Sequence, residues 1–120
     1  MAAVLTDAGR AILAARLKGT GTEPNTQAWG TGAGTAAAAD TALFTEASEA
    51  RVTGTSSVVT TSVTGDTYQV VATLVADAPK TITNAGLFDG AGGMFLHADF
   101  AGEALAAGEA LQFTWQIRFA

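Results

Sequence analysis

The clearest alternation of hydrophobic and polar positions lies at the carboxyl end of the chain. A period of two runs there over nine residues, which predicts a β-strand with one buried and one solvent-facing side. Because a slip of one residue would expose the large apolar groups, we expect the register of this strand to be fixed. The apolar positions are Leu111, Phe113, Trp115, Ile117 and Phe119, separated by the polar residues Gln112, Thr114, Gln116 and Arg118.

Earlier segments also have the composition of strands, with many Val, Thr and aromatic residues. They are expected at residues 52–64, 67–76, 81–88 and 94–100. Gly65-Asp66 has the composition of a two-residue hairpin turn, because glycine supplies a positive φ at the first central position. The glycine-rich residues 89–93 and the segment 102–108 are expected to be the later connections.

Near the amino end the apolar period changes from two to that of a helix. Leu5, Ala8, Ile12 and Ala15 form one stripe, and Thr6 or Asp7 can cap the first turn. Gly19 is a natural stop signal. The spacing therefore predicts a helix over residues 6–18.

Residues 19–50 are the least regular part of the chain, since they are rich in Gly, Thr and Ala. Residues 27–29 have the composition of a short strand and residues 39–44 that of one helical turn. We interpret the remainder as an irregular arm that becomes ordered on neighbouring subunits. Trp29 and Phe44 would then either anchor into a neighbour or pack on the chain's own sheet, and the sequence leaves both possibilities open.

These elements predict one domain over residues 1–120, with the arm at 19–50 and a β domain at 51–120. Its class is mainly β (α+β): an antiparallel β-sandwich or barrel-like meander of about five strands with one N-terminal helix. A chain of 120 residues is long enough for a single modest core.

Charge and cysteine content exclude several classes of protein. Charged residues make up 14% of the chain, against about 25% in ordinary soluble domains, which suits a surface partly covered by neighbours. The net charge is −5 with six scattered Lys and Arg, so nucleic acid is not an expected partner. There is no Cys, which excludes disulfides. We expect no signal peptide and no membrane partner.

No motif in the chain predicts chemistry. Gly30-x-Gly32-x-Gly34 lacks the spacing of a dinucleotide loop and the lysine of a P-loop. His97 and Asp99 share one side of a strand, but no serine stands in a nucleophile elbow. We therefore expect His97 to face solvent or a subunit contact, and we predict no catalytic, cofactor-binding or metal-binding residue. A tight fold of residues 19–50 around a polar cleft at His97 would instead favour catalysis.

Three short runs of residues carry a family resemblance. They are Thr6 to Ala11 (TDAGRA), Ala39 to Leu43 (ADTAL) and, most specifically, Ile82 to Asp89 (ITNAGLFD) followed by a glycine loop and the strand Met94 to Phe100 (MFLHADF). The last element is similar to the virion-proximal domains of phage tail fibres. It also resembles short stand-alone virion structural proteins of tailed bacteriophages.

The resemblance implies a non-enzymatic virion structural protein without a cofactor. Because the chain has no shaft or receptor-binding tip, a capsid cement (decoration) protein that binds and stabilises the assembled head is the leading expectation. Its partners would be the major capsid protein or other virion proteins. It would be a homo-oligomer, for example a trimer, made in the host cytoplasm and located in the virion. The alternatives are a tail, collar, baseplate or fibre-attachment component and a carbohydrate-binding module.

The motif around Gly86 also has a physical interpretation. Leu87 and Phe88 should point to opposite faces of their strand, so that one enters the core and the other an interface. Together with the aromatic and aliphatic residues of the arm and the neighbouring strand, this defines a candidate interface of five residues: Trp29, Leu43, Phe44, Phe88 and Phe95.

Overall fold

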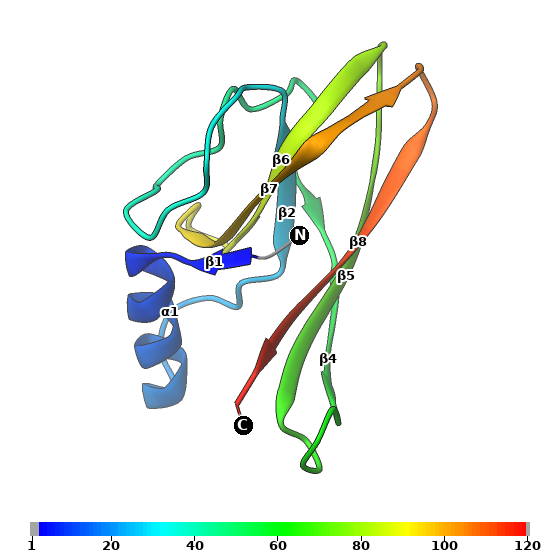
Figure 1. Ribbon diagram of the computed structural model, residues 1–120. Coiled ribbons are helices and arrows are strands. Elements are labelled where there is room, and N and C mark those ends of the chain that lie inside the picture. The colour runs from blue at the N-terminus through cyan, green and yellow to red at the C-terminus, as the bar shows by residue number, and fades with distance from the viewer. Residues whose placement is uncertain (1–2, 120) are drawn as a thin grey trace.

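The computed structural model describes residues 3–119, which contain eight strands and one helix. The strands form a five-stranded sheet of order β1-β7-β6-β2-β3 and a three-stranded sheet of order β4-β5-β8 (Figure 1). All strand pairs are antiparallel. The prediction of a mainly β, sandwich-like fold with an N-terminal helix is confirmed, although the strands number more than five.

The elements follow one another along the chain with short connections, except between β2 and β3. Their bounds are β1 (Ala3–Leu5), α1 (Asp7–Lys18), β2 (Thr26–Gly30), β3 (Val52–Thr53), β4 (Thr55–Val59), β5 (Thr67–Val75), β6 (Lys80–Phe88), β7 (Met94–Leu105) and β8 (Ala110–Arg118).

Helix α1 begins and ends where the sequence predicts. The Thr6 hydroxyl accepts a hydrogen bond from the amide of Gly9 at 2.9 Å, and Gly19 ends the helix with a φ of 90°. Gly9 is also a packing contact, because a Cβ there would lie 2.3 Å from the carbonyl oxygen of Phe95. The first turn of α1 therefore rests directly on the backbone of β7.

The three-stranded sheet contributes the face that the C-terminal alternation predicts. β5 and β8 pair along their whole length, from Thr67 opposite Arg118 to Val75 opposite Ala110. Phe113 and Trp115 are buried against the five-stranded sheet. Phe119 departs from the prediction, because it lies beyond the end of β8 and is 57% exposed.

The five-stranded sheet is covered on both faces. Leu87 and Leu96 point towards the three-stranded sheet and belong to the main core. Phe88 and Met94 lie on the outer face, where Ala28 and Leu43 complete a second apolar cluster. Both side chains of the Leu87–Phe88 pair are thus inside the molecule, because Leu43 of the segment 31–50 covers Phe88 on the outer face.

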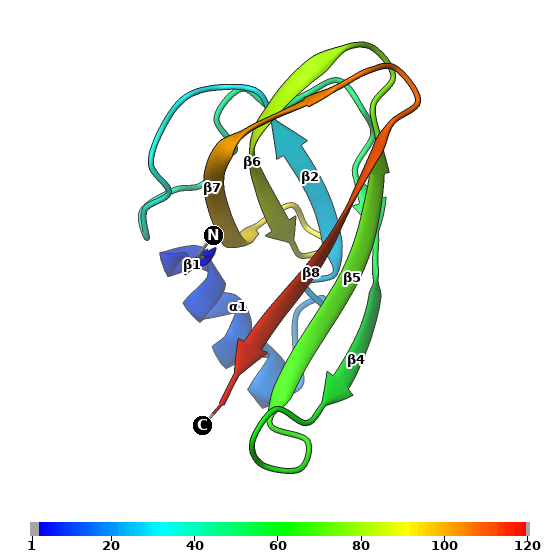
Figure 2. The ribbon, with the colours of Figure 1, turned by 45° about the vertical axis from the view of Figure 1, so that its right-hand side comes forward.

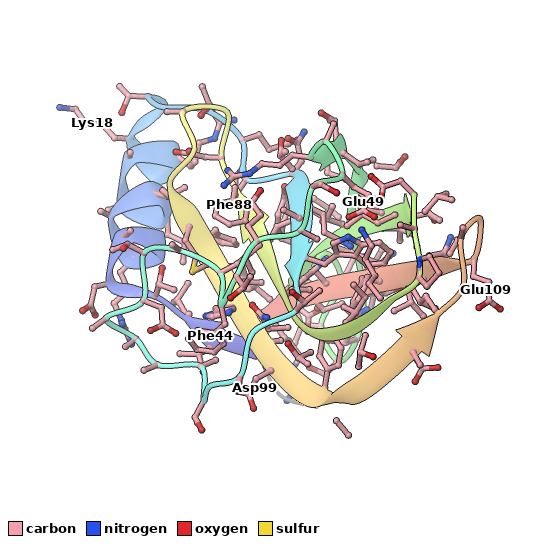
Figure 3. The ribbon with its side chains drawn as sticks, turned by 90° about the horizontal axis from the view of Figure 1, so that it is seen from above. Lys18, Phe44, Glu49, Phe88, Asp99 and Glu109 are labelled. Carbon is pink, nitrogen blue, oxygen red and sulfur yellow. The ribbon has the colours of Figure 1, made fainter. Side chains whose placement is uncertain are left out.

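The cover on the outer face is the segment of residues 31–50, which is the larger part of the arm that the sequence predicts at residues 19–50. It runs beside β7 and β6, with Phe44 turned to the sheet and Asp99 beside it (Figure 3). β2 lies inside the sheet between β6 and β3. In the single chain the segment therefore packs on its own domain. Hydrogen bonds between Phe44 and Asn84 hold it there, together with the side chains of Leu43 and Phe44. The helical turn expected at residues 39–44 does not form.

Two connections differ from the expected turns. Val59 pairs with Thr67, so the hairpin loop includes everything from Thr60 to Asp66 rather than Gly65-Asp66 alone. The carboxylate of Asp66 accepts hydrogen bonds from three amides of this loop, which makes the longer loop stable. Strand β7 continues to Leu105, because residues 103–105 still pair with β6. The final loop is accordingly shorter than residues 102–108.

Candidate functional site

The most concentrated group of buried polar side chains lies between β6, β7 and the segment that covers them. We call it the His97 cluster and define it as Asp40, Asn84 and His97. His97 and Asn84 are both 0% exposed. His97 Nδ1 lies 2.8 Å from Asp40 Oδ2 and Nε2 lies 3.0 Å from Asn84 Oδ1. The Phe44 ring covers the imidazole at a centroid distance of 4.7 Å.

Hydrogen bonds on both sides hold the His97 ring in place. The Phe44 amide donates to Asn84 Oδ1 at 3.0 Å and Asn84 Nδ2 donates to the Phe44 carbonyl at 3.1 Å, so the backbone sets the orientation of the amide group. Nε2 therefore faces an acceptor, and Nδ1 faces the Asp40 carboxylate. Both ring nitrogens are thus occupied by side chains of the same chain, Nδ1 by Asp40 and Nε2 by Asn84.

The environment of Asp40 favours its charged form. A hydrogen bond from the Ala37 amide, at 2.7 Å, is the main cause that lowers the pKa of the carboxyl group. Burial acts in the opposite direction, and the bond and charge of His97 lower the pKa further. The carboxylate thus ties two parts of the molecule together: the turn at Ala37 and strand β7.

His97 is not placed as a catalytic histidine would be. The covering segment does fold around His97, but the ring is fully enclosed and both nitrogens are occupied by side chains of the same chain. The expectation that His97 faces solvent or a subunit is therefore wrong. Asp99 does not contact the ring as a partner either, since its carboxylate accepts from the Ala36 amide at 2.8 Å. The arrangement binds a loop to a sheet and leaves no nitrogen for a substrate.

The Gly30-x-Gly32-x-Gly34 run has a packing role in the same segment. A Cβ at Gly32 would lie 2.6 Å from Thr45 Oγ1, and one at Gly34 would lie 2.7 Å from the Phe44 ring. The Gly32 amide donates to the Phe44 carbonyl at 2.8 Å. Glycine is needed because two stretches of backbone approach closely.

A second polar cluster joins the end of the same segment to the start of β6. Glu49 accepts from the Trp29 indole at 2.8 Å and from the Asp77 amide at 3.0 Å, and it pairs with Lys80. Burial raises the pKa of Glu49, but the hydrogen bonds from Lys80, Asp77 and Trp29 outweigh it and hold the pKa at about 2.

The five residues of the candidate interface are placed mainly inside the chain. Trp29, Phe88 and Phe95 are at most 1% exposed and Leu43 is 7% exposed. Phe44 is half-buried against His97. Their side chains are thus occupied by intramolecular packing in this conformation, and of the two possibilities for Trp29 and Phe44, packing on the chain's own sheet is the one observed.

The structure instead gathers other large apolar side chains on the surface. Leu17, Val58, Val63 and Phe119 are 89%, 71%, 63% and 57% exposed. Leu17 and Phe119 line one groove between α1 and the end of β8. The Phe119 amide donates to the Asp66 carbonyl, and Asp66 in turn bonds to Val63. We call these four residues the apolar end. The sequence does not single out these four residues, because all of them stand in segments predicted as helix or strand, where apolar side chains are expected to be covered.

Comparison of the chain with protein-family models, with curated proteins and with solved structures found no match. Within residues 3–119 there is no group of three or more His, Cys, Asp or Glu side chains that could hold a metal ion. The helix in that part of the chain is not long and apolar enough to cross a membrane.

Proposed function

We propose that the chain is a non-enzymatic virion structural protein of a tailed phage, and specifically a capsid cement protein. The observation that carries the proposal is the apolar end: Leu17, Val58, Val63 and Phe119, which are all more than half exposed. Leu17 and Phe119 line one groove, and large apolar side chains that stay exposed together on a small protein mark a binding surface. A protein that remains bound to a particle can keep such a surface, since the particle covers it.

The polar groups of the molecule support a structural role. The members of the His97 cluster and Glu49 with Lys80 use their hydrogen bonds to hold the segment 31–50 against the sheet. A rigid cover of this kind stabilises the fold and offers no free acid or base. The chain is also poor in charge, at 14%, as expected for a surface that neighbours partly cover.

The stabilising mechanism is mass action. A protein that binds only the assembled shell lowers the free energy of that shell by RT ln(1 + [L]/Kd) at each site, or about 2.7 kcal/mol at a hundredfold excess over Kd. The resemblance of residues 82–100 to virion-proximal domains of tail fibres supports a phage origin. It also leaves a second candidate function, a tail, collar or baseplate component. A carbohydrate-binding module is less favoured, because Trp29 and Trp115 are buried.

Electron cryo-microscopy of the phage that encodes the chain tests the location. We expect copies at regular positions over the whole head. A few copies confined to the tail or collar would contradict the cement role and support the second candidate.

A binding assay tests the surface. Leu17→Lys and Val75→Lys add the same charge at exposed apolar positions, but only Leu17 belongs to the apolar end, whereas Val75 lies at the other end of β5. Heads that lack the protein are incubated with each variant and sedimented. We expect Leu17→Lys to weaken binding at least tenfold and Val75→Lys to bind like the unmodified chain. Equal binding by both variants would contradict the role of the apolar end.

A further inference from the structure

Strand β8 has one edge that no other strand of residues 3–119 covers. It is nine residues long and pairs only with β5. Figure 2 shows β8 at the front of the molecule with its other edge open. The remaining outer strands are short: β1 has three residues, β3 two and β4 five. β8 is therefore the longest strand at a sheet edge.

The direction of the unpaired backbone groups follows from the bonds at both ends of β8. The Ala76 amide donates to the Glu109 carbonyl at 2.8 Å, and the Phe119 amide donates to the Asp66 carbonyl at 2.8 Å. Backbone groups alternate in direction along a strand, so those of the odd-numbered residues point to β5. The amides and carbonyls of the even-numbered residues point to the open edge: Ala110, Gln112, Thr114, Gln116 and Arg118.

This edge lacks the features with which proteins block unwanted strand pairing. Such features are proline, charged side chains and bulges. β8 contains no proline, and its single charged residue is Arg118 at its end. The uncovered part of β7, beyond its pairing with β1 at residues 96–98, carries Asp99 and Glu103 and is thus protected by like charge.

We propose that β8 pairs with β8 of a second copy of this chain, antiparallel and across a two-fold axis at Thr114. In this register Gln112 lies opposite the partner's Gln116, and Phe113 lies opposite the partner's Trp115. Apolar positions meet apolar positions throughout, and polar positions meet polar ones except at the ends. Arg118 lies opposite the partner's Ala110, so no like charges face each other.

The second copy fits better than an unrelated strand for two reasons. An incoming strand must match nine residues with a period of two, and β8 itself has that pattern over its whole length. All nine residues overlap in the register about Thr114, which gives about ten backbone hydrogen bonds from the even-numbered residues of both strands. The apolar groove beside the edge, lined by Phe100, Leu111 and Phe113, adds surface next to the contact.

The product is one continuous sheet of order β4-β5-β8-β8-β5-β4 shared by two copies. The inference goes beyond the proposed function and does not depend on it. Pairing of β8 is measured with the isolated full-length chain, whereas the cement role is measured on phage heads, so each can fail alone.

Sedimentation equilibrium of the full-length chain tests the pairing. Thr114→Lys places two like charges opposite each other on the two-fold axis, at a side chain that is exposed in the monomer. Ser57→Lys is the matched control, because Ser57 is exposed on β4 at the far edge of the same sheet. We expect a dimer for the unmodified chain and for Ser57→Lys, and a dissociation constant at least tenfold higher for Thr114→Lys. A monomer at every concentration, or a dimer that Thr114→Lys leaves unchanged, would overturn the proposal.

Disulfide trapping tests the register. Because the chain has no cysteine, only the introduced residues can form a disulfide. Under mild oxidation Thr114→Cys should form a covalent dimer on its own. Gln112→Cys and Gln116→Cys should cross-link only when they are mixed, since two copies of residue 112 lie about 13 Å apart in this register. Cross-linking of Gln112→Cys alone would overturn the register. A Thr114→Cys chain that cross-links only to another virion protein would overturn the choice of partner.

Discussion

Replacement of Asn84 by alanine tests whether the His97 cluster holds the segment 31–50 in place. The Asn84 side chain is 0% exposed and bonds to the Phe44 amide, the Phe44 carbonyl and His97 Nε2. Asn84→Ala therefore leaves the Phe44 amide, the Phe44 carbonyl and His97 Nε2 without this partner. A buried group that loses its partner costs about 1–3 kcal/mol. Water can reach the half-buried Phe44 backbone in part, so we expect a total loss of about 3–5 kcal/mol.

Urea unfolding measures this loss. With a slope of about 1.5 kcal/mol per molar urea for a chain of this size, the midpoint should fall by about 2–3 M. Asn25→Ala is the matched control, because the Asn25 side chain makes a single bond, to Glu23, and is only half-buried. We expect it to cost less than about 1 kcal/mol. Equal shifts for the two variants would refute our interpretation of the His97 cluster.

Hydrogen exchange shows where the stability is lost. The Phe44 amide bonds to Asn84 of the sheet, and the Gly32 amide bonds to the Phe44 carbonyl within the segment. In Asn84→Ala both amides should exchange by local opening. The amides between β5 and β8 should still require global unfolding. If Phe44 and β5 amides lose protection equally, the segment is part of one cooperative unit with both sheets, and its local attachment through Asn84 is refuted.

Three further predictions concern other contacts. Gly9→Ala should destabilise the fold by at least about 2 kcal/mol, because its Cβ would meet the Phe95 carbonyl at 2.3 Å; thermal unfolding with Ala8→Gly as the control measures this. Glu49→Gln should cost about 1–3 kcal/mol at pH 7, since it weakens the bond to Trp29 and removes the charge opposite Lys80. The pKa of Glu49 is lowered from 4.5 to about 2, so its charge contributes stability above pH 4.5 that is lost as the pH falls towards 2. Urea unfolding from pH 7 to pH 3 should therefore show the gap between Glu49→Gln and the unmodified chain becoming smaller, and a constant gap would contradict this.

The sequence predicts the elements whose signals are local. Helix α1 has a cap at Thr6 and a stop at Gly19, and β8 has its strict alternation, so both were found with nearly correct bounds. The packing of residues 31–50 was not predicted, because it depends on pairing between β2 and β6, where Ala28 meets Gly86 far along the chain. No local pattern encodes such a contact.

The His97 cluster left one signal in the sequence. Asn is uncommon in strands, and Asn84 stands in β6 among apolar residues that are buried on both faces. A buried amide side chain at such a place needs hydrogen-bond partners. The backbone of the irregular segment 31–50 supplies them at Phe44. The apolar end has no comparable signal in the sequence, because the alternation that reaches Phe119 does not reveal that this residue lies beyond the end of β8 and is exposed.

The two proposed surfaces together predict a bivalent particle-binding unit. An antiparallel β8 pair places the Phe119 end of one copy beside Ala110 of the other, so the two apolar ends lie at opposite ends of the dimer, roughly 30 Å apart for strands of this length. A dimer with two such ends can bind two sites of a shell, and the second contact is then intramolecular. Thr114→Lys should therefore weaken binding to phage heads although it lies outside the apolar end, whereas Leu17→Lys should weaken binding and leave the dimer intact. If Thr114→Lys abolishes the dimer and head binding is unchanged, the copies bind singly and the bridging argument is wrong.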